Sequence, residues 1–423
     1  MCYNAENDDR GKKWKSLKFN TALLHKNNGG DPKTGATLTP IYQVSAFSQD
    51  SAEQLERVFN NKAPGFAYSR ISNPTVAAFE NRISALEKGI GAVACSSGMA
   101  AVTMSLLGIL ESGDEVIASS GLFGGTLDLF GDLEAFGIKT RFVEDFTPEE
   151  ILPLINERTR ACFSELIGNP NLKIVDLKAV SAAVHQKGIP LIIDSTTATP
   201  CLINPGDYGA DIIVHSASKY INGGGNAISG IIVDSGNFRW DFDKFRKLKK
   251  YEKLGQFAYL ASLRNGIWRN MGGCLAPMNA FLNEVGMETL GLRMERSCEN
   301  ALRLAEFFER KGITVNYPAL PDNPYNKLCK ELLGGRGGAI LTIRAGSKER
   351  AFRLINALKL ATNATNIGDV RTLVIHPAST IYAHSDEKRR ISAGVYEDTI
   401  RISVGIEDCE DLIEDFRQAI ESL

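Results

Sequence analysis

The feature that most constrains the fold is a succession of short apolar runs between Gly91 and Val233, interleaved with patterns typical of helices. The runs read GAVACS, DEVIAS, IKTRFV, RACFSEL, PLIIDS, DIIVHS and ISGIIVD. Strands that are apolar almost throughout are buried on both faces, as happens when helices connect neighbouring parallel strands. The sequence therefore predicts an α/β fold built on a mostly parallel sheet with helices on both faces.

The chain has 423 residues, more than one ordinary core accommodates. Residues 1–70 lack the strand and helix alternation and are expected to form an arm with short elements, ahead of a large domain over 71–274. Residues 275–423 begin with a long helical stretch, and the glycines of 334–338 predict a turn before the strand AILTIR. We expect a smaller α+β C-terminal domain here, packed against the first because no linker separates them.

Charge and hydropathy exclude several classes of function. The net charge of −2 lacks the positive excess typical of proteins that bind nucleic acid or anionic membranes. The uncharged run from Gly91 to Leu110 is about as long as a membrane span, but CSSG in its middle favours a strand, a turn and a buried helix. The polar, mixed-charge N-terminus is not typical of a signal peptide. We expect small-molecule partners and further copies of this chain.

The eight cysteines are dispersed along the chain, and none has the spacing of a metal site. Such cysteines are typical of reduced thiols that serve as small core residues. This pattern predicts a cytoplasmic protein without a bound metal.

Three apolar runs end in polar residues that could work together. PLIIDS ends at Asp194, DIIVHSASK ends at Lys219, and AVACSSG ends at Gly98. Alone, an aspartate after a strand usually caps a turn or helix, and a lysine there is usually solvated. Because ligands of parallel sheets bind at the carboxyl ends of the strands, we expect these groups to surround one crevice.

An amine, a carboxylate and an anion-binding turn are what pyridoxal 5'-phosphate (PLP) requires. The amine forms a Schiff base with the aldehyde, and the carboxylate keeps the ring nitrogen protonated. Gly98 allows close approach of backbone N–H groups at a helix N-terminus to the phosphate, and Ser216 and Ser218 could add hydroxyl donors. The glycine-rich stretch from Gly223 matches neither common nucleotide-binding loop and predicts only a turn.

Several segments, taken in order, resemble the Cys/Met metabolism group of PLP enzymes, which has the aspartate-aminotransferase type of fold (fold type I). The resemblance starts at TPIYQVSAF, from Thr39, and reaches the C-terminus. It rests on YSRISNPT, CSSGMAA, LFGGT, DIIVHSASKYINGGGNAISG and HPAST followed by RISVGIED.

The resemblance implies roles for the residues around the cofactor. Lys219 matches the Schiff-base lysine and proton shuttle, and Asp194 matches the partner of the ring nitrogen. Gly98 and Met99 would offer N–H groups to the phosphate. Asn169 would lie beside the ring hydroxyl and the substrate carboxylate.

Other roles concern the substrate and the neighbouring subunit. Arg401 matches the arginine that binds the substrate α-carboxylate, which suits its planar fork, and Asn366 would contribute to the same pocket. Tyr68 and Arg70 match residues that reach the phosphate of a neighbouring subunit. The arm would therefore complete the neighbour's site, and the resemblance implies a homotetramer made of two such dimers.

One position departs from the family pattern. The motif normally has a tyrosine stacked on the cofactor ring, where this chain has Phe123. Phenylalanine keeps the stacking face but lacks the hydroxyl, so proton transfer expected of the tyrosine would fall to Lys219.

The C-terminal half most resembles O-acetylhomoserine sulfhydrylases. The implied reaction is γ-replacement, in which sulfide or an equivalent displaces acetate from O-acetyl-L-homoserine to give L-homocysteine for methionine biosynthesis. The alternatives are an O-succinylhomoserine sulfhydrylase, a cystathionine γ-synthase, or a methionine or cystathionine lyase. Gly125, which stands where methionine γ-lyases have a cysteine, counts against methionine γ-lyase activity.

Overall fold

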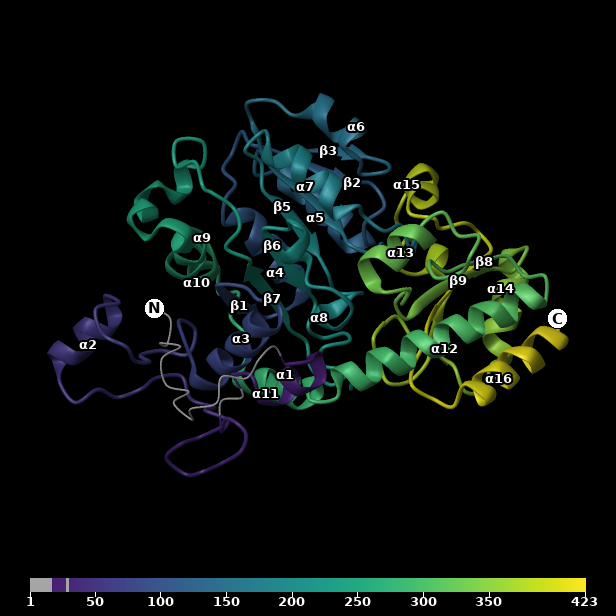
Figure 1. The fold of residues 1–423 in the computed structure, drawn as a ribbon, viewed down its shortest axis with the longest axis horizontal. Coiled ribbons are helices and arrows are strands. Elements are labelled where there is room, and N and C mark those ends of the chain that lie inside the picture. Colours follow the sequence, from purple (N-terminus) through teal and green to yellow (C-terminus); the bar gives the residue numbers. More distant parts are fainter. Residues whose placement is uncertain (1–16, 28–29) are drawn as a thin grey trace.

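The computed structural model describes residues 17–27 and 30–423. The polar N-terminal stretch and Cys2, both interpreted above, lie outside these residues. In the described chain, two sheets lie side by side, and the long helix α12 (Leu290–Arg310) runs from one toward the other (Figure 1).

The larger sheet has seven strands in the order β1-β7-β6-β5-β4-β2-β3. From β3 through β2, β4 and β5 to β6, each strand is parallel to its neighbour. In contrast, β7 runs antiparallel to both of its neighbours, β1 and β6. A parallel neighbour needs a long crossover, usually a helix, and no helix separates β6 from β7. The prediction of a mostly parallel α/β fold is confirmed. The strands are β1 Gly91–Cys95, β2 Glu115–Ser119, β3 Lys139–Val143, β4 Thr159–Glu165, β5 Leu191–Asp194, β6 Ile212–His215 and β7 Gly230–Asp234.

Alternate residues of these strands enter two different cores. In β2, Ile117 packs in the core that contains α3 and α7, whereas Val116 and Ala118 pack in the core that contains α4, α5 and α9. Burial on both faces explains why the inner strands are almost wholly apolar, whereas the edge strand β3 has exposed residues. The helices on this part of the chain are α3 Pro74–Leu86, α4 Gly98–Leu107, α5 Gly124–Glu134, α6 Pro148–Ile151, α7 Leu177–His185, α8 Thr199–Leu202, α9 Ala258–Ser262 and α10 Trp268–Met271.

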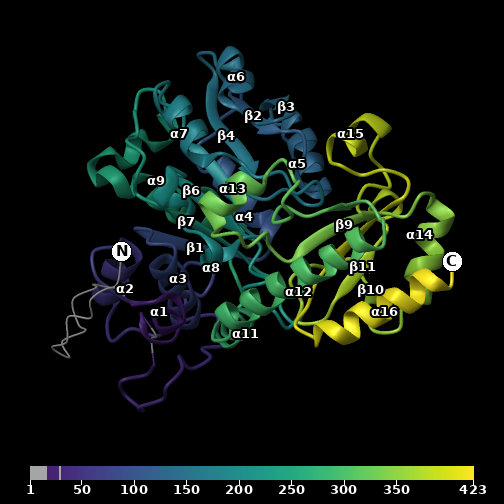
Figure 2. The same ribbon diagram turned by 45° about the vertical axis from the view of Figure 1, so that its right-hand side comes forward.

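The smaller sheet has five strands in the order β10-β11-β12-β9-β8, and only the pair of β10 and β11 is parallel. Its apolar side packs on α12, α14 and α16 (Figure 2). The long helical stretch predicted here is two helices, with α11 preceding α12. The elements are α11 Pro277–Met287, β8 Val315–Asn316, α13 Asn326–Leu333, β9 Ile340–Arg344, α14 Lys348–Ala357, β10 Thr362–Asn363, β11 Leu373–Ile375, α15 Glu387–Ser392, β12 Thr399–Ser403 and α16 Cys409–Glu421.

The segment before α3 holds two short helices, α1 Phe19–His25 and α2 Ala52–Phe59. In Figure 1, α2 lies at the far left, away from the body of the molecule. The run from Gly91 to Leu110 forms β1 and α4, as the sequence predicts. Within the described ranges, no helix is long and apolar enough to cross a membrane.

Candidate active site

Lys219 lies in the turn that follows β6, at the carboxyl end of the larger sheet. Its side chain is half-buried, and Nζ donates a hydrogen bond to Oδ1 of Asn366. Burial, aided by the charge of Arg401, lowers the pKa of Lys219 to about 8. Near neutral pH this amine is therefore neutral, and thus nucleophilic and basic, far more often than an ordinary lysine.

Arg401 reaches the same place from β12 of the smaller sheet. One terminal nitrogen, Nη2, donates to the backbone carbonyl of Asn366 at 2.9 Å, and Nη1 donates to Oδ1 of Asn169 at 3.2 Å. The residue is buried, and Nε has no partner among the described residues. Burial lowers the pKa of Arg401 to about 10, and this buried, partly unpaired guanidinium is suited to bind a carboxylate.

Asp194 ends β5, next to the strand that leads to Lys219. Its Oδ1 accepts the N–H of Thr196 at 2.9 Å, and the hydroxyl of Thr196 accepts the N–H of Ser216 at 2.7 Å. Burial raises the pKa of Asp194, while Thr196 and the charge of His215 act in the opposite direction. A cation beside the carboxylate would favour its ionised form.

Gly98 starts α4 directly against the turn after β6. A Cβ atom on Gly98 would lie 2.6 Å from Cβ of Ser216, too close for any side chain. Ser97 caps the helix by accepting the N–H of Ala100 at 3.0 Å. The N–H groups of Gly98 and Met99 lie in the first turn of α4, where a phosphate is stabilised by the helix dipole.

Ser218, predicted to bind phosphate, uses its hydroxyl within the protein. Its Oγ donates to the carbonyl of Ser229 at 3.0 Å and accepts the N–H of the same residue at 2.8 Å. These bonds fix the turn before β7.

Phe123 precedes α5, and its backbone is held by a residue that the sequence analysis missed. The N–H of Phe123 donates to Oε1 of Glu165 at 2.7 Å, and the N–H of Asn169 donates to Oε2 at 3.0 Å. Burial and the nearby Asp194 raise the pKa of Glu165 to about 8. A signal was present, because Glu165 ends β4 as Asp194 ends β5, and the two are paired in register.

Tyr68 and Arg70 lie between α2 and α3. Arg70 Nη1 donates to the carbonyl of Arg269 at 2.9 Å, and its guanidinium carbon lies 5.4 Å from the centroid of the Tyr68 ring. In the described chain neither residue has a hydrogen bond or ion pair with Lys219, Asp194 or Ser216. The other predicted residues do come together, at the carboxyl end of the larger sheet.

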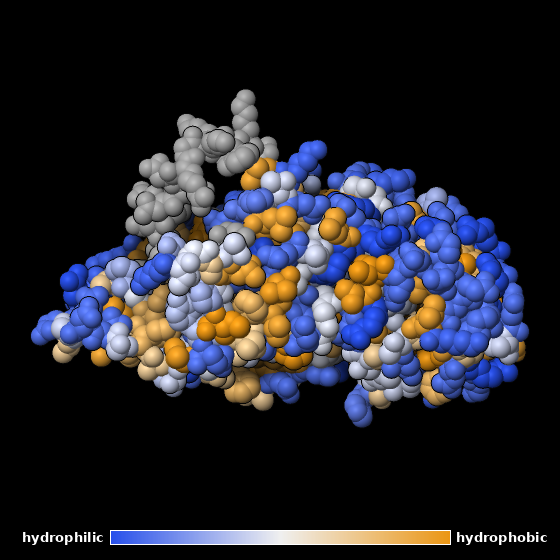
Figure 3. All heavy atoms as spheres, turned by 90° about the horizontal axis from the view of Figure 1, so that it is seen from below, coloured by the Kyte–Doolittle hydropathy of each residue, from blue (hydrophilic) through white to orange (hydrophobic). Residues whose placement is uncertain are grey.

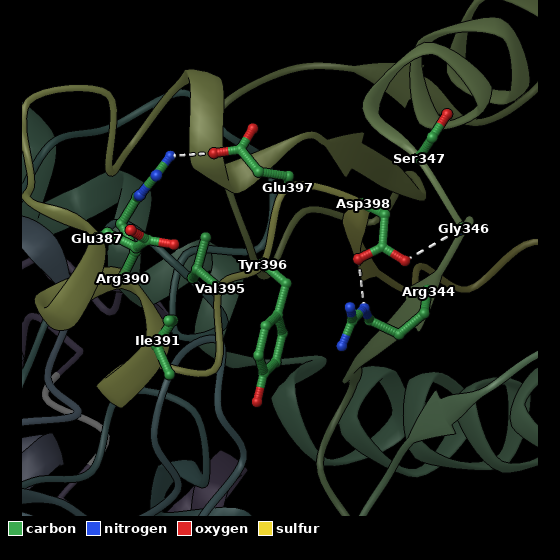
Figure 4. A pocket seen from close by; sticks show the side chains of 10 residues that line it. All are labelled: Arg344, Gly346, Ser347, Glu387, Arg390, Ile391, Val395, Tyr396, Glu397 and Asp398. Carbon is green, nitrogen blue, oxygen red and sulfur yellow. Dashed lines mark hydrogen bonds and ion pairs between the residues drawn. The ribbon is translucent and has the colours of Figure 1, made fainter.

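A separate cavity of about 340 Å³ lies beside α15 (Figure 4). Its lining charges are largely paired, Arg344 with Asp398 and Arg390 with Glu397. It contains neither Lys219 nor Asp194 and lacks the groups that PLP needs. Elsewhere in the described chain, no group of three or more His, Cys, Asp or Glu residues could hold a metal ion.

The residues around Lys219 fit PLP. They include an amine of lowered pKa, a partly buried carboxylate, a helix start without room for a Cβ atom, and a guanidinium with an unpaired nitrogen. The fold and this set of groups define a PLP-dependent enzyme of fold type I.

Comparison with known proteins identifies the family. Residues 20–421 match the model of the Cys/Met metabolism PLP-dependent enzymes, and the chain belongs to this family. A homocysteine synthase from Schizosaccharomyces pombe is 40% identical over 420 residues, covering 95% of this chain and 98% of that protein. An O-acetyl-L-homoserine sulfhydrylase from Corynebacterium glutamicum is 41% identical over 417 residues, covering 94% and 95%.

Among solved structures, a putative O-acetylhomoserine (thiol)-lyase from Campylobacter jejuni has a TM-score of 0.91 and 33% identity. The match covers 96% of this chain and all of that one, which contains N'-pyridoxyl-lysine-5'-monophosphate. The predictions of fold type I and of PLP as cofactor are thereby confirmed. The individual site residues remain predictions.

Proposed function

We propose that this enzyme catalyses γ-replacement on O-acetyl-L-homoserine, in which sulfide or an equivalent displaces acetate and L-homocysteine forms for methionine biosynthesis. The observation that carries the proposal is Asn366, whose side chain accepts from Lys219 while its backbone carbonyl accepts from Arg401. An amino acid whose carboxylate is bound by Arg401 would have its α-carbon near Lys219. The names of the relatives in S. pombe, C. glutamicum and C. jejuni support the choice of substrate.

The chain's own residues would orient the substrate and move its protons. Arg401 and Asn169 bind the carboxylate, and Lys219 accepts the proton from the α-carbon because its neutral form is abundant near pH 8. When bound, PLP supplies an electron sink that stabilises negative charge at the α-carbon. Asp194 provides a fixed negative charge for the cofactor ring, and Lys219 returns a proton at the end of the reaction.

Phe123 has a ring for stacking but no hydroxyl to donate or accept a proton. The departure of acetate therefore depends on Lys219 rather than on residue 123. Acetate leaves readily as an anion, so the missing hydroxyl is less costly here than for a poorer leaving group.

The test is an assay of purified holoenzyme with O-acetylhomoserine or O-succinylhomoserine, with and without sulfide. Homocysteine and 2-oxobutyrate are measured in each reaction. Homocysteine formed from the acetyl ester and sulfide is the expected result. Preference for the succinyl ester, or rapid 2-oxobutyrate production from methionine, would replace the proposal with one of the alternatives.

We also propose that the active unit is a homodimer, two of which form a tetramer, and that the protein works in the cytoplasm. Tyr68 and Arg70 are not bonded to their own chain's site, and Tyr68 is 41% exposed. Figure 3 shows apolar side chains at the surface of the half that carries the N-terminal segment. The seven cysteines of the described residues are unpaired, which supports a reducing compartment. The large exposed apolar residues of the N-terminal segment include Ile41, Tyr42, Val44, Leu55 and Phe59.

The division into three parts is proposed with the same boundaries as above. Residues 1–70 would serve the neighbouring subunit, 71–274 would hold the cofactor, and 275–423 would bind the substrate carboxylate. The two sheets, with β7 ending at Asp234 and β8 starting at Val315, support the division.

A further inference from the structure

Buried polar groups that the proposed mechanism does not use hold the turn around Phe123 from two sides. From the larger sheet, Glu165 accepts the N–H groups of Phe123 and Asn169. From the other side, the hydroxyl of Tyr382 donates to the carbonyl of Leu122 at 2.8 Å and lies 3.4 Å from the carbonyl of Asn169. Tyr382 is 1% exposed. Leu122, Phe123 itself and Asn169 are therefore bonded to two buried side chains, Glu165 and Tyr382.

The segment that carries Tyr382 lies directly against the start of α5. A Cβ atom on Gly124 would lie 2.6 Å from the backbone oxygen of Ile381, so only glycine permits this approach. The segment is in turn held by His376, whose ring pairs with Ser379 Oγ and with the carbonyl of Glu397, each at 2.8 Å. Glu397 lies just before β12, which carries Arg401. One continuous set of contacts thus links the strand of the carboxylate-binding arginine to the turn of Phe123.

A phenylalanine has no polar atom through which its ring can be oriented. Its position depends on its backbone and on packing alone. The carbonyl of Leu122 is bonded inside the core, and the part-buried N–H of Phe123 is bonded to Glu165. Losing either partner would leave an unsatisfied backbone group that favours displacement of the turn.

We propose that Glu165 and Tyr382 are positioning residues that set the placement of the Phe123 ring over the cofactor and of Asn169 beside it. Because Tyr382 belongs to the segment between β11 and β12, this placement also depends on how the smaller sheet, which carries Arg401, packs against the larger one. The inference rests on the predicted stacking of Phe123 and extends the proposed function by naming residues that prepare the site.

The chain offers a matched control for Tyr382. Tyr317 is also fully buried, and its hydroxyl also contacts two backbone carbonyls, of Gly338 at 2.8 Å and of Cys298 at 3.3 Å. Tyr317 packs in the core of the smaller sheet, and among the described residues it forms no hydrogen bond with Lys219, Asp194 or Arg401. Replacing either tyrosine by phenylalanine removes one oxygen and, with it, the hydroxyl donor that two backbone carbonyls share.

The experiment compares Tyr382→Phe and Tyr317→Phe holoenzymes with the wild type. Three quantities are measured: the thermal midpoint of unfolding, the visible circular dichroism of the bound cofactor, and the rate of PLP release into a trap. We expect similar losses of thermal stability in both variants. Only Tyr382→Phe should change the dichroism and release PLP about threefold to tenfold faster, since only there does the stacking ring move.

Glu165→Gln serves as the second variant, because it keeps the volume while placing an amide NH2 against one of the two N–H groups. It should change the dichroism in the same way. Wild-type dichroism and PLP release in both Tyr382→Phe and Glu165→Gln would overturn the proposal, as would equal changes in Tyr317→Phe. Neither the dichroism nor the rate of PLP release requires a substrate. This test can therefore fail while the sulfhydrylase assay succeeds, and it can succeed while that assay fails.

Discussion

At the scale of single residues, Asn366 holds the site together. Its carbonyl and its side-chain oxygen accept from Arg401 and Lys219, respectively, which fixes the separation of the groups expected to bind the carboxylate and to move the α-proton. The family resemblance implies that Asn366 lies near the substrate carboxylate. Its contact with Lys219 was not predictable, because the two residues are 147 positions apart along the chain.

The lowered pKa of Lys219 gives a prediction for cofactor uptake. The neutral amine is the form that attacks the aldehyde, so uptake of PLP by the cofactor-free protein should accelerate as pH rises through about 8 and then level off. Stopped-flow absorbance across this range measures it. A rate that keeps rising toward the ordinary lysine pKa of 10.5 would contradict the prediction.

Lys219→Ala should bind PLP only noncovalently and have no turnover.

Arg401→Lys should separate binding from catalysis. A lysine has no planar fork and cannot keep both bonds to Asn169 and Asn366 while binding a carboxylate. We expect KM for O-acetylhomoserine to rise about 10-fold to 100-fold, with PLP binding unchanged. Arg303→Lys is the control, because Arg303 forms an exposed ion pair with Glu410 in the same part of the chain. An unchanged KM in Arg401→Lys would contradict the role of Arg401.

At the scale of elements, the start of α4 should be sensitive to one methyl group. In Gly98→Ala, the new Cβ would overlap Ser216, so we expect a loss of stability of about 1–3 kcal/mol and weaker PLP binding. Gly131→Ala is the control, because Gly131 lies within α5 and a Cβ there meets no atom within 4 Å. That change should stabilise the protein by about 0.5–1 kcal/mol. Denaturant unfolding and PLP titration measure both effects, and equal behaviour of the two variants would contradict the close approach.

The elements themselves were largely predictable. Every strand of the larger sheet lies on one of the predicted runs. The signal is strongest for the inner strands, which are buried on both faces, and weaker for the edge strand β3. The reversed direction of β7 was not predicted, since direction depends on how the chain crosses the sheet. Glu165 was overlooked because a single carboxylate after a strand has many ordinary explanations, and its two N–H donors are visible only in three dimensions.

At the scale of the whole molecule, the composite site can be tested by mixing inactive variants. If Arg70 serves the neighbouring subunit, a dimer of one Lys219→Ala chain and one Arg70→Ala chain contains one intact site. Refolding the two variants together should restore up to about a quarter of the wild-type activity, because about half of the dimers are mixed. Mixing Lys219→Ala with Asp194→Ala is the control and should restore nothing, since both residues belong to the same subunit's site. No recovery in the first mixture would contradict the composite site.

The relative placement of the two sheets was beyond the sequence analysis. The bond between Arg401 and Asn169 joins residues 232 positions apart, and no periodicity of strands or helices encodes such a contact. The family resemblance supplied the expectation that both residues lie near the substrate. The distances and the connecting atoms came only from the folded chain.

Arg401 comes from the smaller sheet, whereas Asp194 ends one strand of the larger sheet and Lys219 follows another. The residues expected to hold the cofactor and the residue expected to bind the substrate carboxylate therefore lie on different sheets. If Arg401 binds the substrate carboxylate as proposed, mutations in the smaller sheet that leave Asn366 and Tyr382 in place would alter substrate binding while Lys219 and Asp194 stay unchanged. A mutant library restricted to that sheet should therefore yield mostly coloured, PLP-loaded proteins with altered substrate preferences, a favourable starting point for new activities.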